Sequence, residues 1–258
     1  MLFAWLKRRR RRKILETPFP RAWLETLEAI PHIPILASER RLDHQNATQI
    51  FLAEKTFEGC GGLTLTDTMR VTIAGLATLL VLGMPETQFD HVDSVLVYPD
   101  AFTRPKKIDM GPVALEEDAH LLGEAHYRGP VILSWAEIEE DVREPWLGRN
   151  LVFHEFAHQL DMMNGEADGV PELPYALREP WAKVMAKEYR RLQRQTHRQR
   201  ETLLDPYGAT EPAEFFAVIT ETFFDSPLDL EIERPELYAI LRQYYCLDPA
   251  MKMRAAGR

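Results

Sequence analysis

The spacing of hydrophobic residues divides the chain into two helical regions with a short region of strands between them. From Pro18 to about Gln88, apolar residues recur every three or four positions, and Val71 to Leu82 is rich in alanine and leucine. This period is typical of helices that bury one face. It returns at about Trp146 and continues through most of the rest of the chain. We therefore predict helices over both regions.

Between the helical regions, β-branched residues cluster in short runs that are typical of strands. One run is Ser94–Tyr98, which is bounded by Pro99 and Asp100, and a second is Gly129–Trp135. Gly123–Arg128 could add a further short strand or a turn. With helical layers flanking these strands, we predict an α+β fold that is mostly helical and has a small antiparallel sheet.

Length and composition are those of a globular protein. The chain has 258 residues, of which 45% are hydrophobic and 28% are charged. We predict a basic N-terminal tail over residues 1–17, a helical region over 18–90 and a further domain over 91–258, which contains the chemical motifs described below. The two cysteines, Cys60 and Cys246, are far apart and lack CxxC spacing, so neither a disulfide framework nor a thiolate metal site is indicated. A cytoplasmic protein fits these features best.

Charge is distributed unevenly along the chain. Lys7–Lys13 is a run of seven basic residues, which leaves 24 basic against 40 acidic side chains elsewhere. This acidic body is a poor surface for nucleic acid, so no direct nucleic-acid partner is expected. We expect a solvated tail, with peripheral contact to an anionic membrane or nucleic acid as the alternative. The apolar Met1–Leu6 precedes the charge, the wrong order for a signal peptide, and no segment has the roughly 20 apolar residues of a transmembrane helix.

The most specific chemical pattern is an HExxH pentapeptide, which runs from His154 to His158. On a helix, positions four apart share a face, so both imidazoles can reach one Zn²⁺ while Glu155 acts as a base for metal-bound water. The surrounding residues are apolar and predict burial, where two histidines and a glutamate are costly unless a metal ion or hydrogen bonds satisfy them. Surface or satisfied core histidines are the alternative, and the buried setting favours the metal site. Asn164–Gly165 is expected to end this helix.

A catalytic zinc site usually has three protein ligands, so a third must lie elsewhere. The metzincin pattern HExxHxxGxxH is excluded, because Asp161 stands at its glycine position and Asn164 at its final histidine. In a later apolar helix, Glu214 and Glu221 lie seven residues apart and share a face. Residue types alone leave Glu214, Glu221 and the acids from Asp161 to Asp168 as candidate ligands, and a basic partner as the alternative for a buried carboxylate.

Segments spread over the last two thirds of the chain match the pattern of a known family. They are Val95–Pro99, Gly129–Trp135, Gly148–Asp161, Asn164–Gly165, Gly169–Pro171, Asp205–Tyr207 and Pro212–Val218. Together they resemble the MtfA family, the Mlc titration factor A peptidases, over residues 90–250 and only loosely before that. The family is similar to the catalytic domain of anthrax lethal factor, which implies a zincin-like domain with an HExxH helix and a downstream glutamate helix. The arginine-rich N-terminus and the region from Pro105 to Leu121 depart from better-known members.

The resemblance implies that His154, His158 and Glu214 bind one zinc ion and that Glu155 is the catalytic acid/base. The expected activity is that of a zinc-dependent peptidase, with aminopeptidase action on short peptides. In this mechanism Glu155 takes a proton from zinc-activated water and later delivers it to the leaving amine. Tyr207 occupies a tyrosine position of the family pattern and is our candidate donor to the oxyanion, with a core or turn tyrosine as the alternative.

Three further expectations concern the surroundings of the site. Asp161 and Glu221 are candidates to accept the outer N–H of a ligand histidine, and either could instead be a solvated helix acid. Val131–Ser134 could form the sheet edge to which an extended peptide substrate adds. Because family members sequester the repressor Mlc, the alternative function is a regulatory interaction protein that captures a transcriptional repressor, with peptidase activity secondary.

Overall fold

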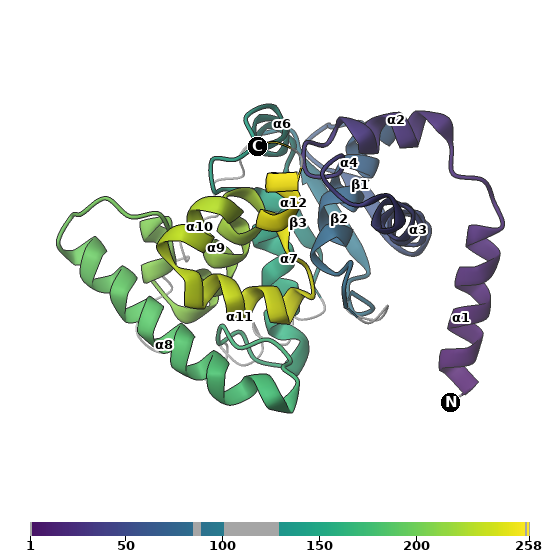
Figure 1. The fold of residues 1–258 in the computed structure, drawn as a ribbon. Coiled ribbons are helices and arrows are strands. Elements are labelled where there is room, and N and C mark those ends of the chain that lie inside the picture. Colours follow the sequence, from purple (N-terminus) through teal and green to yellow (C-terminus); the bar gives the residue numbers. More distant parts are fainter. Residues whose placement is uncertain (1, 85–88, 101–128, 256, 258) are drawn as a thin grey trace, which may run out of the picture.

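The chain folds into helices packed around a small sheet. The computed structural model describes residues 2–84, 89–100, 129–255 and 257. Figure 1 shows α7 (Leu151–Asp161) in the middle of the molecule, with helices of the first third on one side and those of the last third on the other. None of the described helices combines the length and the apolar character needed to cross a lipid bilayer.

The first third is mainly helical, as its periodicity predicts, but it also contains a strand that the prediction missed. Its elements are α1 (Leu2–Leu15), α2 (Arg21–Ala29), α3 (Ser38–Glu54), β1 (Thr56–Gly59) and α4 (Asp67–Leu80). Because β1 follows α3 after a single residue and Phe57 continues the apolar spacing of that helix, the pattern gave no sign of a strand.

The rest of the chain supplies two further strands and most of the remaining helices. The elements are β2 (Ser94–Tyr98), β3 (Val131–Ser134), α6 (Trp135–Arg143), α7, η1 (Met162–Asn164), α8 (Tyr175–His197), η2 (Pro206–Ala209), α9 (Pro212–Asp225), α10 (Pro227–Glu233), α11 (Pro235–Tyr245) and α12 (Pro249–Ala255). Both strands that we predicted are present, whereas α6 was not predicted. The possible strand Gly123–Arg128 lies outside the described residues.

The prediction of an α+β fold with an antiparallel sheet is wrong, because every strand pair in the described part of the chain is parallel. The strand order is β1-β2-β3, with Phe57 opposite Val95 and Leu96 opposite Ile132. Parallel neighbours need a long crossover between them. α4 lies in the connection from β1 to β2, and the connection from β2 to β3 is also long. Without β1, no pattern of residues indicated such crossovers.

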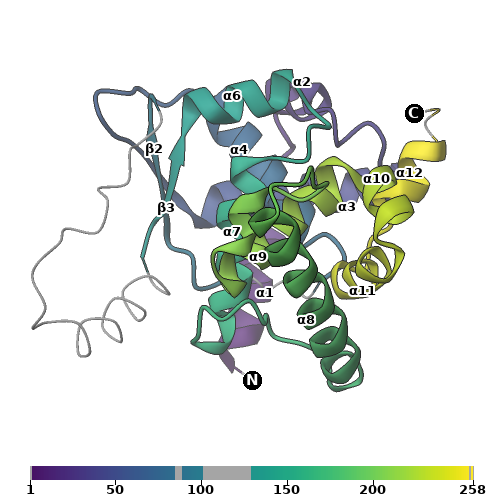
Figure 2. The ribbon, with the colours of Figure 1, turned by 90° about the vertical axis from the view of Figure 1, so that its left-hand side faces the viewer.

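The core brings α7 and α9 together. Val152, Phe153 and Phe156 of α7 are fully buried, and every residue of α9 from Ala213 to Asp225 is buried. α7 packs against α9 on one side and against α4 and β3 on others. Figure 2 shows β2 and β3 at one side of the molecule and α11 and α12 at the other, with α7 and α9 between them. Polar side chains on the facing surfaces of α7 and α9 are therefore held within a rigid interior.

Candidate metal centre

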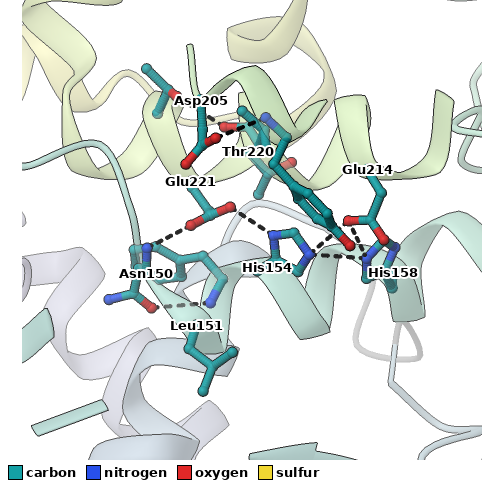
Figure 3. Close-up of polar contacts among 12 residues, drawn as sticks. Asn150, Leu151, His154, His158, Asp205, Glu214, Thr220 and Glu221 are labelled. Carbon is teal, nitrogen blue, oxygen red and sulfur yellow. Dashed lines mark hydrogen bonds and ion pairs between the residues drawn. The ribbon is translucent and has the colours of Figure 1, made fainter. Parts of the chain in front are cut away.

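Two histidines of α7 and one glutamate of α9 converge on a single point (Figure 3). Oε2 of Glu214 lies 3.0 Å from Nε2 of His154 and 3.4 Å from Nε2 of His158. The two Nε2 atoms lie 3.2 Å from each other. The three ligand atoms therefore form a nearly equilateral triangle. Both histidine side chains keep some exposure, 13% and 15%, so the triangle is open to solvent.

This triangle has the dimensions of three corners of a metal coordination tetrahedron. Zinc bonds nitrogen and oxygen at about 2.0 to 2.2 Å, which places tetrahedral ligand atoms roughly 3.3 Å from one another. Oε2 of Glu214 is buried, and its contacts with the histidines do not have hydrogen-bond geometry. A buried oxygen without such a bond needs another partner. Among the described residues, His154, His158 and Glu214 are the only group of at least three His, Cys, Asp or Glu side chains whose ligand atoms lie close enough together to hold a metal ion.

The N-terminus of α7 is fixed by side chains that satisfy its free N–H groups. Oδ1 of Asn150 accepts a hydrogen bond of 3.1 Å from the Phe153 N–H, as expected of a helix N-cap. Oδ2 of Asp141 accepts one of 2.8 Å from the Leu151 N–H. The carboxylate also interacts favourably with the positive end of the helix dipole. The register of α7, and thus the direction of both histidines, is set by these bonds.

The C-terminal end of α7 passes into the short helix η1, which closes at Gly165 with a left-handed φ of 94°. The Gly165 N–H donates to the Met162 carbonyl over 2.9 Å. This conformation strains residues that carry a Cβ atom, so glycine suits the position. The predicted left-handed residue is present at Gly165, but it closes η1, and α7 itself ends earlier, at Asp161.

Glu221 links the second ring nitrogen of His154, Nδ1, to the backbone just before α7. Its Oε1 lies 2.7 Å from Nδ1 of His154, and its Oε2 accepts a hydrogen bond of 2.7 Å from the Asn150 N–H. Figure 3 shows these contacts on the side of the imidazole opposite Glu214. An Nδ1–H that donates to Glu221 leaves a lone pair on Nε2, the atom that faces His158 and Glu214. Of the two acids considered from the sequence, Glu221 makes the contact.

Asp161, the other acid, contacts no ligand histidine. Its Oδ2 accepts a hydrogen bond of 2.9 Å from the Gly169 N–H, and so holds the loop after η1. Burial raises the pKa of this carboxyl to about 6, against the opposing effect of that bond. The expectation that Asp161 orients a histidine has no support in the contacts of the described residues.

The charges at the centre favour a cation between the histidines. Burial disfavours protonated His154, but its interactions with Glu214 and Glu221 outweigh burial and raise its pKa to about 10. Burial opposes ionisation of Glu214, yet the two histidines hold its pKa well below the usual range. A pocket that stabilises a positive charge on His154 beside an ionised carboxylate also suits a divalent cation.

Glu155 and Tyr207 lie at the same site. Glu155 follows His154 on α7 and is partly exposed. Tyr207 belongs to η2, and its ring centroid is 6.2 Å from that of His154, with the side chain 49% exposed. Oδ1 of Asp205 accepts a hydrogen bond of 2.8 Å from the Tyr207 N–H and fixes the backbone there. Tyr207 therefore lies beside the His154 ring and at the surface, which excludes a core tyrosine, whereas its place in the short helix η2 agrees with the turn tyrosine that we considered as the other alternative.

Sequence reasoning missed a buried pair that holds the loop before α7. Oδ1 of Asp225 lies 3.0 Å from Nε2 of His32, and its Oδ2 accepts a hydrogen bond of 2.7 Å from the Gly148 N–H. The two side chains are 1% and 2% exposed. Asp225 stands four positions after Glu221 and thus on the same face of α9, a spacing that could have marked it. No comparable signal exists for His32, which lies almost two hundred positions earlier.

The donor set defines the class of protein. An HExxH helix whose histidines meet a distant carboxylate is the arrangement of HExxH metallopeptidases. Comparison with known proteins agrees: the chain belongs to the family of glucose-regulated metallo-peptidases M90, whose family model matches residues 5–246. A metallopeptidase family implies a metal ion, and the site described above fits one.

Relatives match over almost the whole chain. An uncharacterised protein of Synechocystis, slr2042, is 40% identical over 247 residues, which are 93% of this chain and 89% of that protein. Mlc titration factor A of Pectobacterium atrosepticum is 33% identical over 240 residues, 90% of this chain and 89% of its own. The Klebsiella pneumoniae protein of that name is 32% identical over 233 residues, 87% of each chain. The resemblance to the MtfA family is thus confirmed.

Proposed function

We propose that this protein is a zinc-dependent aminopeptidase in which His154, His158 and Glu214 hold the metal ion and Glu155 is the general base. The observation that carries the proposal is the triangle of ligand atoms, with sides of 3.0, 3.2 and 3.4 Å. Three protein ligands leave a fourth position for water or substrate, as catalytic zinc sites require. Bound there, zinc would supply a Lewis acid that polarises the peptide carbonyl and lowers the pKa of water to about 7.

The protein's own residues then perform the proton transfers. Glu155 accepts a proton from the attacking water at its carboxylate and donates it to the nitrogen of the leaving amine. Glu155 follows His154 on α7, and its charge contributes to the raised pKa of that histidine. Tyr207, exposed and adjacent to the His154 ring, is our candidate to donate a hydrogen bond to the developing oxyanion through its hydroxyl. Glu221 keeps the imidazole of His154 in the orientation that presents Nε2.

Glu221→Gln is expected to weaken zinc binding by roughly 10- to 100-fold, the usual cost of losing a partner that orients a ligand. The amide has one oxygen, whereas Glu221 accepts bonds from both His154 and Asn150 with two. Competition with a fluorescent zinc chelator measures the change. Asp161→Asn is the matched control, because its carboxylate holds Gly169 and should leave zinc affinity nearly unchanged. Equal losses in both variants would mean that Glu221 only supports the fold.

The backbone of β3 offers a place for an extended substrate. The Thr56 N–H donates to the Asp93 carbonyl and the Cys60 N–H to the Val97 carbonyl, so the odd-numbered residues of β2 are directed toward β1. Leu96 is therefore directed toward β3, and its partner Ile132 is directed away from β2. Within the described residues no strand pairs with that side of β3. We propose that substrate peptides add to it as a strand.

Ile132→Pro removes the N–H that such a substrate would bond, without removing a bond to β2. We expect kcat/KM for peptides to fall at least about tenfold, the effect of losing a hydrogen bond of this kind, while zinc content stays the same. Ile132→Ala keeps the N–H and serves as the control for the side chain, which is 43% exposed. Unchanged kinetics in the proline variant would exclude strand addition at this edge.

Cleavage of matched peptides tests the aminopeptidase assignment. Peptides of six residues with free and acetylated N-termini are incubated with the zinc-loaded protein and with Glu155→Gln, and the products are identified by mass spectrometry. The proposal expects stepwise loss of N-terminal residues from the free peptides only, and no cleavage by the variant. Internal cuts in acetylated peptides would identify an endopeptidase instead. Equal cleavage by the variant would show that Glu155 is not the base.

Capture of a repressor is the second candidate function, and the names of the relatives favour it. Several proteins at 30% to 33% identity are called Mlc titration factor A. We propose that this chain too can sequester a repressor of the Mlc type, with peptidase activity secondary. His154→Ala should abolish hydrolysis and leave capture intact if capture uses another surface. A pull-down with purified Mlc on wild type and variant distinguishes the two functions, and no binding by either protein would exclude the second.

A further inference from the structure

The basic run near the N-terminus lies on a helix at the edge of the molecule. α1 carries Lys7–Lys13 and packs against α3, the only described helix with which it makes extensive contact. Figure 1 shows it as the outermost helix on its side, apart from α7 and the C-terminal helices. The stretch that we assigned to a basic tail therefore contains an ordered element with a defined outward face.

One arginine of the run fixes α1 to the body. Arg11 is 8% exposed, and its guanidinium donates to both carboxylate oxygens of Glu54, over 3.0 and 2.7 Å, and to Asp90 over 2.9 Å. Lys7 also forms an ion pair with Asp90. A buried, bidentate arginine of this kind is specific in its geometry. These contacts fix the face of α1 that packs against the body and leave the other five basic residues of the run exposed.

The exposed side of α1 is strongly basic, and its N-terminal end is apolar. Five of the seven basic residues are exposed to solvent: Arg8, Arg9, Arg10, Arg12 and Lys13. The preceding turn exposes Trp5 by 54% and Leu6 by 46%, and the guanidinium of Arg9 lies over the Trp5 ring at 5.6 Å. Trp5 and Leu6 thus form an exposed apolar pair directly beside the cluster of cations.

We propose that α1 docks the protein on the surface of an anionic phospholipid bilayer. The basic residues match the negative charge of lipid phosphates, and tryptophan and leucine match the boundary between headgroups and acyl chains, where tryptophan is enriched. Helices that combine these two features lie at membrane surfaces without crossing them. The apolar end of α1 would enter the boundary, while the arginines that follow would remain among the phosphates.

The acidic body explains why contact would be confined to α1. Outside the basic run, the chain has 24 basic and 40 acidic side chains, so the body as a whole carries a net negative charge that opposes binding to anionic lipid and to nucleic acid. Charges are screened over about 8 Å at physiological salt, so a protruding cationic helix can bind while the body remains at a distance. Nucleic acid offers the same phosphates but no apolar layer for Trp5 and Leu6, which favours the bilayer.

Sedimentation with vesicles tests the proposal on the full chain. The protein is mixed with vesicles of phosphatidylcholine alone or with 30% phosphatidylglycerol, at about 0.1 and 0.5 M NaCl, salt concentrations at which screening differs strongly. One variant carries Arg8→Gln, Arg9→Gln and Arg12→Gln and keeps the Arg11 anchor. The matched control carries Arg190→Gln, Arg194→Gln and Arg198→Gln, which removes the same charge from three exposed positions on or next to α8. A third protein carries Trp5→Ala.

We expect binding to the anionic vesicles only, weakened by salt, and reduced at least about tenfold in the α1 variant but not in the α8 control. Trp5→Ala should bind less than wild type at both salt concentrations, because the apolar contribution is not screened. Circular dichroism should show the same fold in all variants. The absence of binding to anionic vesicles, equal losses in both arginine variants, or an unchanged Trp5→Ala protein would overturn the proposal. So would tighter binding through α1 to a 30-base-pair DNA duplex than to the vesicles.

Discussion

Glu155→Gln is expected to lose about 10²- to 10⁴-fold in kcat while binding zinc as the wild type does, because the amide cannot accept the proton of the attacking water. Glu155 lies between the ligand histidines in the sequence but is not one of the three converging groups. Its loss should therefore affect chemistry and leave the metal in place. Initial rates on a free peptide, together with zinc content by mass spectrometry, measure both quantities.

The control for this change is Glu166→Gln, in the exposed loop after α7. It removes the same charge close by in the sequence and should leave kcat and zinc content unchanged. Near-wild-type turnover by Glu155→Gln would assign the proton transfer to another group. Loss of zinc from Glu155→Gln would instead make Glu155 part of the metal site, which contradicts the ligand set that we propose.

Glu214→Ala is expected to bind almost no zinc. Its loss of zinc affinity should exceed the roughly 10- to 100-fold loss that is typical when a residue that only orients a ligand is replaced. Two histidines alone then remain, and catalytic zinc sites use three protein ligands. Because a ligand that binds only the folded state stabilises it, a chelator should lower the thermal midpoint of the wild type. The same chelator should not change the midpoint of the variant.

Glu211→Ala provides the comparison within the same segment. Glu211 is exposed, precedes α9 and makes no capping hydrogen bond with its side chain. Its replacement should preserve zinc content and the response to chelator. Glu214→Ala could also lose metal through unfolding, so circular dichroism of the metal-free proteins is compared first. A folded Glu214→Ala protein that binds one zinc ion with wild-type affinity would exclude Glu214 as a ligand.

The sequence predicted much of the site because one helix encodes most of it. The i, i+4 spacing in α7 brings His154 and His158 to one face, and this follows from helical geometry alone. The third group was harder, since residue types left Glu214 and Glu221 open as ligands. In the structure both contact His154, one at Nε2 and the other at Nδ1. The spacing along α9 indicates that both acids share the face toward α7. It does not indicate which ring nitrogen of His154 each carboxylate contacts.

The sheet could not be predicted in the same way, because strand direction depends on connections far along the chain. β1 is four residues long and follows α3 without residues typical of a turn, so its apolar residue was interpreted as part of the helix. β1 pairs with β2 in parallel, and α4 lies in the crossover that such a pair requires. The contact between His32 and Asp225 was similarly hidden, because it joins distant segments through a single side-chain pair.

Anomalous X-ray diffraction at the zinc absorption edge, on crystals of protein purified without added metal, tests the central claim most directly. The account predicts one strong peak, about 2.0 to 2.2 Å from Nε2 of His154, Nε2 of His158 and an oxygen of Glu214. The absence of a peak between these atoms would contradict the account. So would a peak that lies at bonding distance from both histidines but not from Glu214.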